Sequence, residues 1–244
     1  IDECGFPPGV FNLVNGDRVA AERLLEHPDV QGISFVGTSQ VCRTVAVRSA
    51  ETNKRFQALG SAKNHLVVMP DAKMDSVIQN MISSCYGCAG QRCMASSAIV
   101  CVGDEVCRNV TDAFLEASQK VLVASPLDPA VAGESMLMGP VISAKAKRFI
   151  TGMIQTGVDE GATLALDGRG LEVKGCQGGH FIGPTVFIGV KPGMKIHQTE
   201  IFGPVVVIIQ VATLDEAIQI INDHQYGNGA SIYTQNGHHA REFK

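Results

Sequence analysis

Cys93 closes a glycine-rich segment that begins at Gly87 and contains Gly90. A cysteine thiolate is a strong nucleophile, and glycines let the backbone turn sharply and approach a ligand closely. The charge of Arg92 favours the thiolate where the two side chains face each other. On these residues alone, a buried thiol in a connection between a helix and a strand is the more common case, and a nucleophilic thiol at Cys93 is the alternative.

The same segment has residue types that suit a metal site, because Cys85 and Cys88 precede Cys93 closely. A structural zinc site takes four ligands, usually as two pairs of matched spacing. The next cysteines, Cys101 and Cys107, fall in an expected strand and an expected helix. The sequence therefore favours no metal here, and most of its eight cysteines are expected to be reduced and buried.

A second candidate site lies where the strand expected at 33–36 is followed by Gly37 and by Thr38 or Ser39. Either hydroxyl can cap the helix expected to run to about Ala50. Backbone N–H groups and the positive end of the helix dipole then face a potential anion. A phosphate can bind at such a helix start, although one glycine and one cap occur in many α/β proteins.

The elements that must position these residues alternate along the chain. Strand patterns cover 9–16, 65–69, 98–102, 185–188 and 205–211, and helix patterns cover 20–26, 72–85, 106–121, 143–160 and 213–221. Alternating strands and helices are typical of α/β domains, so we expect a mostly parallel sheet covered by helices. The glycine-rich stretch 168–179 is expected to be a surface loop.

The composition limits the classes of function that the chain can have. With 244 residues, of which 45% are hydrophobic, the chain can bury a sizeable core. A net charge of −4 excludes a generally basic nucleic-acid binder. No apolar run reaches the roughly 20 residues of a membrane span, and no basic-then-apolar leader is seen. The start at Ile1 and a helix pattern that continues to Lys244 predict a piece of a longer protein, rather than a complete domain with frayed ends.

Several blocks of the chain closely resemble the aldehyde dehydrogenase superfamily, over nearly the whole length. They are I-S-F-V-G-T at 33–38, A-K-N-H at 62–65, V-V-M-P-D-A at 67–72, A-G-Q-R-C-M-A at 89–95, E-I-F-G-P at 200–204, and 214–220 leading to 226–229. Within the superfamily, they are most similar to the CoA-acylating branch that acts on methylmalonate semialdehyde. The resemblance implies an aldehyde dehydrogenase-like α/β fold. Residues 1–58 would end a Rossmann-type NAD-binding domain, and residues 59–244 would form part of a catalytic domain with a mostly parallel sheet.

The resemblance also implies site residues for an NAD-dependent oxidation. Cys93 would attack the aldehyde and carry the thioester, and its own backbone N–H would help to hold the oxyanion. Thr38 would contact the cofactor pyrophosphate, and Gly60 and Phe202 would lie near the nicotinamide. Glu200 would accept hydrogen bonds from the nicotinamide ribose hydroxyls. An ordinary helix cap at Thr38 and a solvated loop carboxylate at Glu200 are the alternatives.

Arg92 is expected to bind the carboxylate of the substrate, because a guanidinium suits a planar, bidentate partner. The alternative is an arginine that orders the glycine-rich loop. Two positions depart from the family pattern, since Cys42 and Ser61 stand where glycine is usual. Both add atoms where the chain and the cofactor are expected to come close.

The fate of the acyl group depends on Leu59. Hydrolytic members of the superfamily carry a glutamate in an E-L-G-G-K motif, and aligning its lysine with Lys63 places Leu59 in the glutamate position. Leucine cannot serve as a general base for water, whereas the thiol of coenzyme A needs little help. The sequence therefore predicts transfer to coenzyme A, with Glu200 as the alternative base for hydrolysis.

The expected reaction converts methylmalonate semialdehyde and malonate semialdehyde to propionyl-CoA and acetyl-CoA, with NAD as the oxidant. A hydrolytic aldehyde dehydrogenase and an inactive fragment that keeps the fold are the alternatives. The expected partner is a small semialdehyde acid, with neither nucleic acid nor membrane, and the full-length protein is expected to form a homo-oligomer, usually a tetramer in this family. Such enzymes lie in the mitochondrial matrix of eukaryotes and in the cytoplasm of bacteria.

Overall fold

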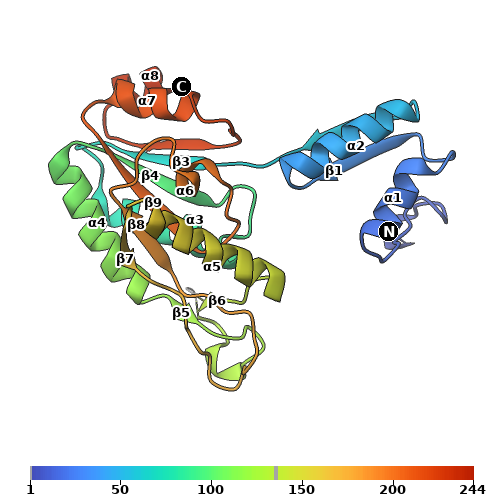
Figure 1. The fold of residues 1–244 in the computed structure, drawn as a ribbon, viewed down its shortest axis with the longest axis horizontal. Coiled ribbons are helices and arrows are strands. Elements are labelled where there is room, and N and C mark those ends of the chain that lie inside the picture. Colours follow the sequence, from blue (N-terminus) through green and yellow to red (C-terminus); the bar gives the residue numbers. More distant parts are fainter. Residues whose placement is uncertain (1, 135–136) are drawn as a thin grey trace. The chain divides into compact units, whose positions relative to one another are not determined.

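The computed structural model describes residues 2–134 and 137–244, and the chain divides into two compact units, Ile1–Ser61 and Ala62–Lys244. Figure 1 shows the elements of both units in the colours of the sequence. Among the described residues, no helix is both long enough and apolar enough to cross a membrane. The assignment of one unit to cofactor binding and of the other to catalysis stays a prediction.

In its described residues, the first unit holds two α-helices, a short 3-10 helix (Asp2–Cys4) and a two-stranded parallel sheet. Its elements are α1 (Arg18–Glu26), β1 (Gly32–Val36), α2 (Ser39–Glu51) and β2 (Arg55–Leu59). The predicted cap of α2 is present, because the Thr38 hydroxyl oxygen accepts a hydrogen bond from the N–H of Val41 at 3.4 Å. The strand predicted at 9–16 is wrong: these residues form no strand, and their apolar side chains, such as Phe11 and Leu13, are exposed.

The second unit is built on a six-stranded sheet with the strand order β10-β3-β4-β9-β8-β7. Its strands are β3 (Asn64–Val68), β4 (Ser96–Val102), β7 (Thr163–Leu166), β8 (Thr185–Ile188), β9 (Val205–Val211) and β10 (Ala230–Tyr233). Neighbouring strands are parallel except for the antiparallel pair β7 and β8. The α/β class and the mostly parallel sheet are therefore confirmed.

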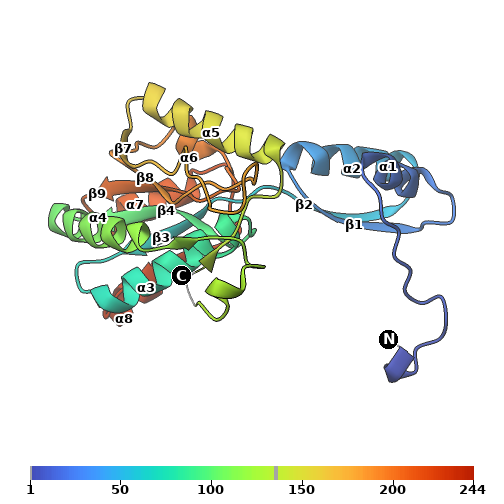
Figure 2. The same cartoon turned by 90° about the horizontal axis from the view of Figure 1, so that it is seen from below.

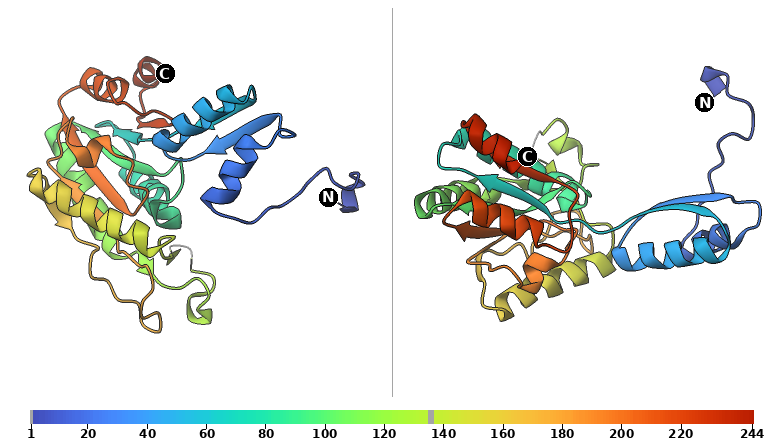
Figure 3. Two further views of the ribbon diagram at one scale, coloured as in Figure 1. Left: turned by 45° about the vertical axis from the view of Figure 1, so that its right-hand side comes forward. Right: turned by 90° about the horizontal axis from the view of Figure 1, so that it is seen from above.

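Helices cover both faces of this sheet. They are α3 (Met74–Tyr86), α4 (Asp104–Gln119), α5 (Ala144–Asp159), α6 (Lys195–Gln198), α7 (Leu214–Asn222) and α8 (Gly237–Phe243), and a short two-stranded sheet pairs β5 (Leu122–Val123) with β6 (Leu137–Met138). Figure 2 shows α5 and α3 on opposite faces of the six-stranded sheet. The helices α7 and α8 lie side by side (Figure 3).

The central strands are buried along their length, as expected for parallel strands with helices on both sides. In β4 and β9 almost every side chain is inaccessible to solvent, including Val100 and Val207. The segments that precede β3, β4, β9 and β10 meet at one edge of the sheet, because these strands run parallel. This amino-terminal edge collects the residues around Cys93 and Glu200, and it is here that the second unit holds its candidate site.

Candidate active site

The turn that presents Cys93 starts where α3 ends, in a 3-10 segment at Gly87–Gly90. Three consecutive residues, Cys88, Ala89 and Gly90, have positive φ angles of 53°, 54° and 71°. Side chains disfavour this left-handed conformation by about 1–2 kcal/mol per residue. Strained backbone of this kind persists only where its surroundings fix it, and it is concentrated at functional sites.

Two contacts hold this turn against the rest of the second unit. A side chain at Gly90 would collide with the carbonyl group of Gly203, so only glycine fits between the turn and the segment after Glu200. The Gln91 amide oxygen accepts a hydrogen bond from the N–H of Ile142 at 2.8 Å. The turn is therefore joined to two segments that are far away in the sequence.

The thiol of Cys93 is exposed, while the backbone around it is held firmly. The carbonyl oxygen of Cys93 accepts hydrogen bonds from the side-chain amides of Asn64 and Asn228, each at 2.8 Å. The N–H of Ala95 donates to the carbonyl oxygen of Arg92 at 3.0 Å, which closes a tight turn around the cysteine. This arrangement presents an exposed thiol from a hydrogen-bonded backbone, which suits the nucleophile predicted at Cys93.

A narrow pocket of about 20 Å³ brings the predicted residues of this unit together. It is lined by Ala62, Asn64, Cys85, Gly90, Arg92, Cys93, Ala95, Ser96, Ser97, Glu200, Ile201, Phe202 and Gly203. Cys93, Arg92, Glu200 and Phe202 thus share one pocket, although the chain between them is long. Phe202 has a φ of 54° and is 45% exposed, so its backbone is strained like that of Cys88 and Ala89, and its side chain is accessible to solvent.

The three clustered cysteines have separate environments. Cys85 is buried in α3, and burial raises the pKa of its thiol, whereas Cys88 and Cys93 are exposed. Within residues 2–134 and 137–244, no group of three or more His, Cys, Asp or Glu side chains is placed to hold a metal ion. A buried neutral thiol in Cys85 suits packing better than metal ligation.

Arg92 contacts the end of α3, which bears on the loop-ordering role given as the alternative from the sequence. Its guanidinium lies against Gly87, where a side chain would collide with it, and Nη2 donates to the carbonyl oxygen of Ser83 at 2.8 Å. The same carbonyl oxygen accepts a hydrogen bond from the N–H of Gly87, so Arg92 adds a second hydrogen bond at the end of α3, a common use of arginine near a helix end. The loop-ordering role is therefore present. Because the side chain is also exposed and lines the pocket, its other donors are available to a carboxylate.

A buried lysine is bonded to the segment that leads to Glu200. In the sequence, this lysine served only to align the E-L-G-G-K motif. Lys63 is 1% exposed, and its Nζ donates to the carbonyl oxygens of Ile196 at 3.1 Å and Thr199 at 3.0 Å. Burial lowers the pKa of Lys63 to about 7, and the charge of Glu200 partly opposes this effect. Lys63 thus fastens the segment that carries Glu200 to the start of β3. A lysine directly before a buried strand was the signal that could have revealed it.

Three buried histidines surround this lysine. The Nε2 atoms of His65 and His197 are 2.9 Å apart, and Nδ1 of His65 is 3.0 Å from the carbonyl oxygen of Lys63. Nε2 of His224 is 3.1 Å from the carbonyl oxygen of His197. Burial lowers the pKa of His65 to about 4 and that of His197 to about 3. The rings of His65 and His197 are therefore neutral near pH 7, and all three rings pack as hydrogen-bonded parts of the core.

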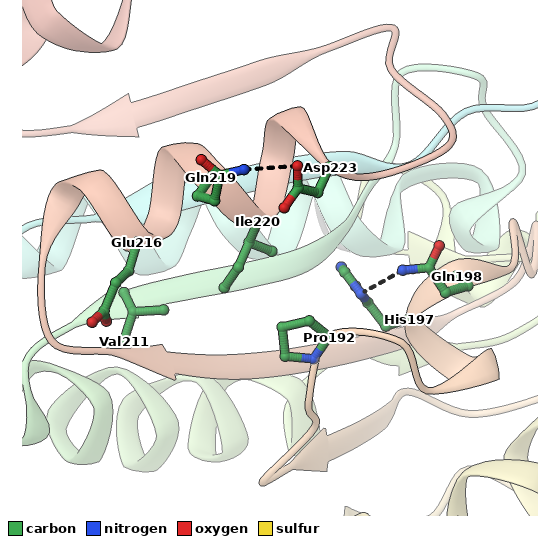
Figure 4. A pocket seen from close by; sticks show the side chains of 8 residues that line it. All are labelled: Pro192, His197, Gln198, Val211, Glu216, Gln219, Ile220 and Asp223. Atoms are coloured by element: carbon green, nitrogen blue, oxygen red, sulfur yellow. Dashed lines mark hydrogen bonds between the residues drawn. The ribbon is translucent and has the colours of Figure 1, made fainter.

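A larger cavity of about 350 Å³ lies over α7, and none of the predicted site residues lines it. Figure 4 shows its side chains, among them Glu216 and Asp223 of the α7 region. Glu216 accepts a hydrogen bond from the N–H of Ala212 at 2.7 Å, and Asp223 accepts one from Gln219 at 2.7 Å. Glu216 therefore serves the start of the helix, and Asp223 pairs with another side chain of the same helix.

The first unit holds the residues predicted to contact the cofactor pyrophosphate. Thr38 and the start of α2 supply a hydroxyl and backbone donors at a helix N-terminus, which suits a phosphate in kind. The N–H of Ser39 donates to the Ser61 hydroxyl at 3.2 Å, and the N–H of Ser61 donates to the Ser39 hydroxyl at 3.0 Å. A side chain at Gly60 would lie 2.7 Å from the Ser39 hydroxyl oxygen. The helix start suits a pyrophosphate in kind, although the N–H of Ser39 is bonded to Ser61 and the N–H of Val41 is bonded to Thr38.

The departure at Cys42 also has local partners. Its Sγ donates to the carbonyl oxygen of Leu59 at 3.0 Å and lies 3.6 Å from that of Gly37. The thiol fills the space between α2 and the ends of both strands, and it is buried there. Cys42 therefore fixes the backbone of Leu59, the residue predicted to stand in the glutamate position.

Comparisons with known proteins show which proteins have a similar sequence and architecture. The family model described as "Aldehyde dehydrogenase family" matches residues 1–244. A malonate-semialdehyde dehydrogenase of Pseudomonas aeruginosa is 44% identical over 243 residues, which is 99% of this chain and 48% of that protein. The mitochondrial methylmalonate-semialdehyde/malonate-semialdehyde dehydrogenase [acylating] of Bos taurus is 40% identical over 241 residues, 99% of this chain and 44% of that protein.

A solved structure agrees with these relatives. It is that of a proposed methylmalonate-semialdehyde dehydrogenase from Sinorhizobium meliloti, complexed with NAD. This chain superposes on it with a TM-score of 0.92 at 39% identity, over 99% of this chain and 48% of that one. The chain therefore spans about half the length of the relatives it matches.

Proposed function

The chain belongs to the aldehyde dehydrogenase family, and on this premise we propose that its protein oxidises methylmalonate and malonate semialdehyde with NAD and transfers the acyl group to coenzyme A. One observation carries the proposal: the exposed thiol of Cys93, on a strained turn, shares a pocket with Arg92, Glu200 and Phe202. The names of the relatives support the substrate class.

The chemistry begins at the Cys93 thiolate. Its Sγ attacks the aldehyde carbon, a carbon–sulfur bond forms, and the carbonyl oxygen becomes an oxyanion that the backbone N–H of Cys93 helps to hold. NAD supplies the acceptor for the hydride that the carbon then loses. Cys93 is left carrying the acyl group as a thioester, which is a good acyl donor because a thiolate is a good leaving group.

The cofactor contacts follow from residue types in both units. We assign the pyrophosphate to Thr38 and the start of α2, and we expect contacts with the nicotinamide from Gly60 of the first unit and from Phe202 of the second. Glu200 has a carboxylate that can accept hydrogen bonds from two ribose hydroxyls. Lys63 supports this assignment, because its two hydrogen bonds fix the segment that ends at Glu200.

Substrate recognition is assigned to Arg92. The substrate has a carboxylate besides its aldehyde, and Arg92 keeps donors available at the pocket after its bond to Ser83. A guanidinium and a carboxylate form short, charge-assisted hydrogen bonds. The same side chain therefore orders the turn and selects an acidic aldehyde.

Release of the acyl group is assigned to coenzyme A because Leu59 stands in the position of the water-activating glutamate. General-base help is worth about 10² to 10⁴ in rate, so hydrolysis without it is slow. A thiol with a pKa of about 8.5 is already a few per cent thiolate at neutral pH. The expected products are propionyl-CoA and acetyl-CoA, after loss of the substrate carboxylate as carbon dioxide.

A hydrolytic reaction is the second candidate, and one observation favours it. Glu200 lines the same pocket as Cys93, so its carboxylate could accept a proton from water near the thioester. The two candidates differ in their need for coenzyme A. A homotetramer stays a prediction that sedimentation would test, and the compartment follows from the source organism, since the Bos taurus relative is named mitochondrial.

The test is product analysis of the protein expressed from its complete gene, with NAD and malonate semialdehyde, in the presence and absence of coenzyme A. We expect acetyl-CoA, and NADH formation in the steady state, only when coenzyme A is present. Cys93→Ser should abolish turnover, and Cys88→Ser is the matched control that should keep it. An equal rate without coenzyme A would contradict acyl transfer, and an active Cys93→Ser with an inactive Cys88→Ser would contradict the nucleophile.

A further inference from the structure

Resting on the proposed function, we infer that Asn64 and Asn228 are positioning residues that together fix the backbone of Cys93 for attack. Their side-chain amides donate to the same acceptor, the carbonyl oxygen of Cys93, and both N···O distances are 2.8 Å. A carbonyl oxygen has two lone pairs, so these two bonds saturate it. The amides come from the start of β3 and from the loop before β10.

Asn64 uses nearly all of its hydrogen-bonding capacity around the nucleophile. Its Nδ2 donates a second bond to the carbonyl oxygen of Ala95 at 2.8 Å, and its Oδ1 accepts from the N–H of Gly229 at 2.9 Å. The side chain is only 4% exposed. A carboxylate here would bring no donor to the two carbonyl groups, so the position requires an amide. Asn64 thereby ties the Cys93 turn to the loop that carries Asn228.

Asn228 bonds to Cys93 from a backbone conformation that side chains rarely adopt. Its φ is 97°, and Gly227 and Gly229 flank it. Glycine would take this φ without strain, and nothing buried demands a side chain, because Asn228 is exposed. The strained asparagine keeps an amide in place on the carbonyl group of Cys93. Strain of this kind beside a proposed nucleophile points to a role in the site.

The two hydrogen bonds to the carbonyl oxygen of Cys93 help to fix the direction in which its thiol points. The orientation of the Cys93 carbonyl group sets its ψ angle, and ψ together with the rest of the turn sets the direction of the Cα–Cβ bond. The bond from the N–H of Ala95 to the carbonyl oxygen of Arg92 holds the other side of the turn. The Sγ atom of Cys93 and its backbone N–H, which is assigned to the oxyanion, then keep a fixed position relative to each other. Small displacements of reacting groups lower rates strongly, so loss of a clamp should lower kcat more than binding.

The first test is Asn228→Gly in the protein expressed from its complete gene, because this change removes the amide and the strain together. We expect kcat for malonate semialdehyde to fall roughly threefold to tenfold, the worth of one neutral hydrogen bond, with KM changed less than about twofold. The thermal midpoint should stay or rise. The matched control is Asn53→Gly, which changes another asparagine with positive φ, 56°, in the first unit and should keep the wild-type kcat.

The second readout needs no activity. Hydrogen–deuterium exchange of the peptide that spans residues 92–96 should be roughly threefold to tenfold faster in Asn228→Gly and unchanged in Asn53→Gly. Asn64→Asp should change kcat and exchange in the same direction; where it does not fold, Asn228→Gly decides. Wild-type kcat or wild-type exchange in Asn228→Gly overturns the inference and leaves the proposed function intact. An inactive wild-type protein overturns the proposed function, and exchange alone then decides the positioning role.

Discussion

Replacing Lys63 by methionine should remove one component of the pH dependence of stability. Lys63 is 1% exposed, and burial lowers its pKa from 10.5 to about 7. In the unfolded chain the amine regains its ordinary pKa, so between pH 7 and 10.5 the unfolded state binds more protons than the folded state. The free energy of unfolding therefore rises with pH across this window, and the cost of the buried charge is fully present below it.

The magnitude follows from the lowered pKa. A difference of one proton changes the free energy of unfolding by about 1.4 kcal/mol per pH unit. The folded-state pKa of about 7 makes the slope half of this value at pH 7 and nearly complete one pH unit higher. Lys63 alone should then add about 2 kcal/mol of stability between pH 7 and pH 9.

The assay is urea unfolding followed by circular dichroism at about pH 7, 8 and 9, for the wild type and for Lys63→Met. The wild type should gain about 2 kcal/mol more than the variant across this range, at equal m-values. Methionine leaves the carbonyl groups of Ile196 and Thr199 without their amine donor, so the variant should be less stable throughout. Parallel pH profiles would refute the reasoning and would show that Lys63 stays charged beside Glu200.

Four further changes test other parts of the site. Gly90→Ala should lower the thermal midpoint by several degrees and turnover about tenfold or more, because its methyl group meets the Gly203 carbonyl group at a positive φ; an unchanged melting curve would contradict the contact. Arg92→Leu should raise KM for malonate semialdehyde far more than for propanal, whereas equal losses would limit Arg92 to ordering the turn. Leu59→Glu should raise NADH formation in the absence of coenzyme A, and no change would remove Leu59 from the glutamate position. Burial lowers the pKa of His65 to about 4, so the unfolded state takes up its proton first as pH falls below 6.5. The wild type should therefore lose about 2 kcal/mol of stability between pH 7 and 5. In His65→Gln, urea unfolding should show that this loss is absent.

The sequence was sufficient for elements with strong local signals. The helix over 144–159 begins where Ser143 accepts a hydrogen bond from the N–H of Ala146, and α7 begins at Thr213 with the same kind of cap. The buried strands β8 and β9 have the predicted bounds, because uninterrupted apolar runs suffice to specify parallel strands with two covered faces. Local pattern and tertiary packing agree in these elements.

Elements that depend on a distant partner were not predictable in this way. The strand β10, Ala230–Tyr233, is short and mixed in character, and it becomes a strand by pairing with β3, which lies far earlier in the chain. The stretch 9–16 shows the opposite case. It has the apolar residues of a strand but no partner among the described residues, and the structure leaves it irregular and exposed. Local propensity is overridden in both cases by the availability of pairing.

The site shows the same division. The glycines around Cys93 identified its turn, because sharp backbone conformations have a residue signature. The bond between Asn228 and Cys93 joins residues 135 positions apart, and no local pattern reports such a contact. Lys63 was missed for a related reason, since its burial depends on the segment at Ile196 and Thr199 that covers it.

The contact between Asn228 and Cys93 also has a consequence for the order of events on the ribosome. Synthesis proceeds at about 5–20 residues per second, so the 135 residues that separate them require roughly 7–27 s. Throughout this interval one of the two amide partners of Cys93 does not yet exist. The turn of Cys93 therefore acquires its final geometry only when β10 pairs with β3, near the end of translation of this segment. A nascent chain arrested before residue 228 would carry an exposed thiol whose turn is not yet closed.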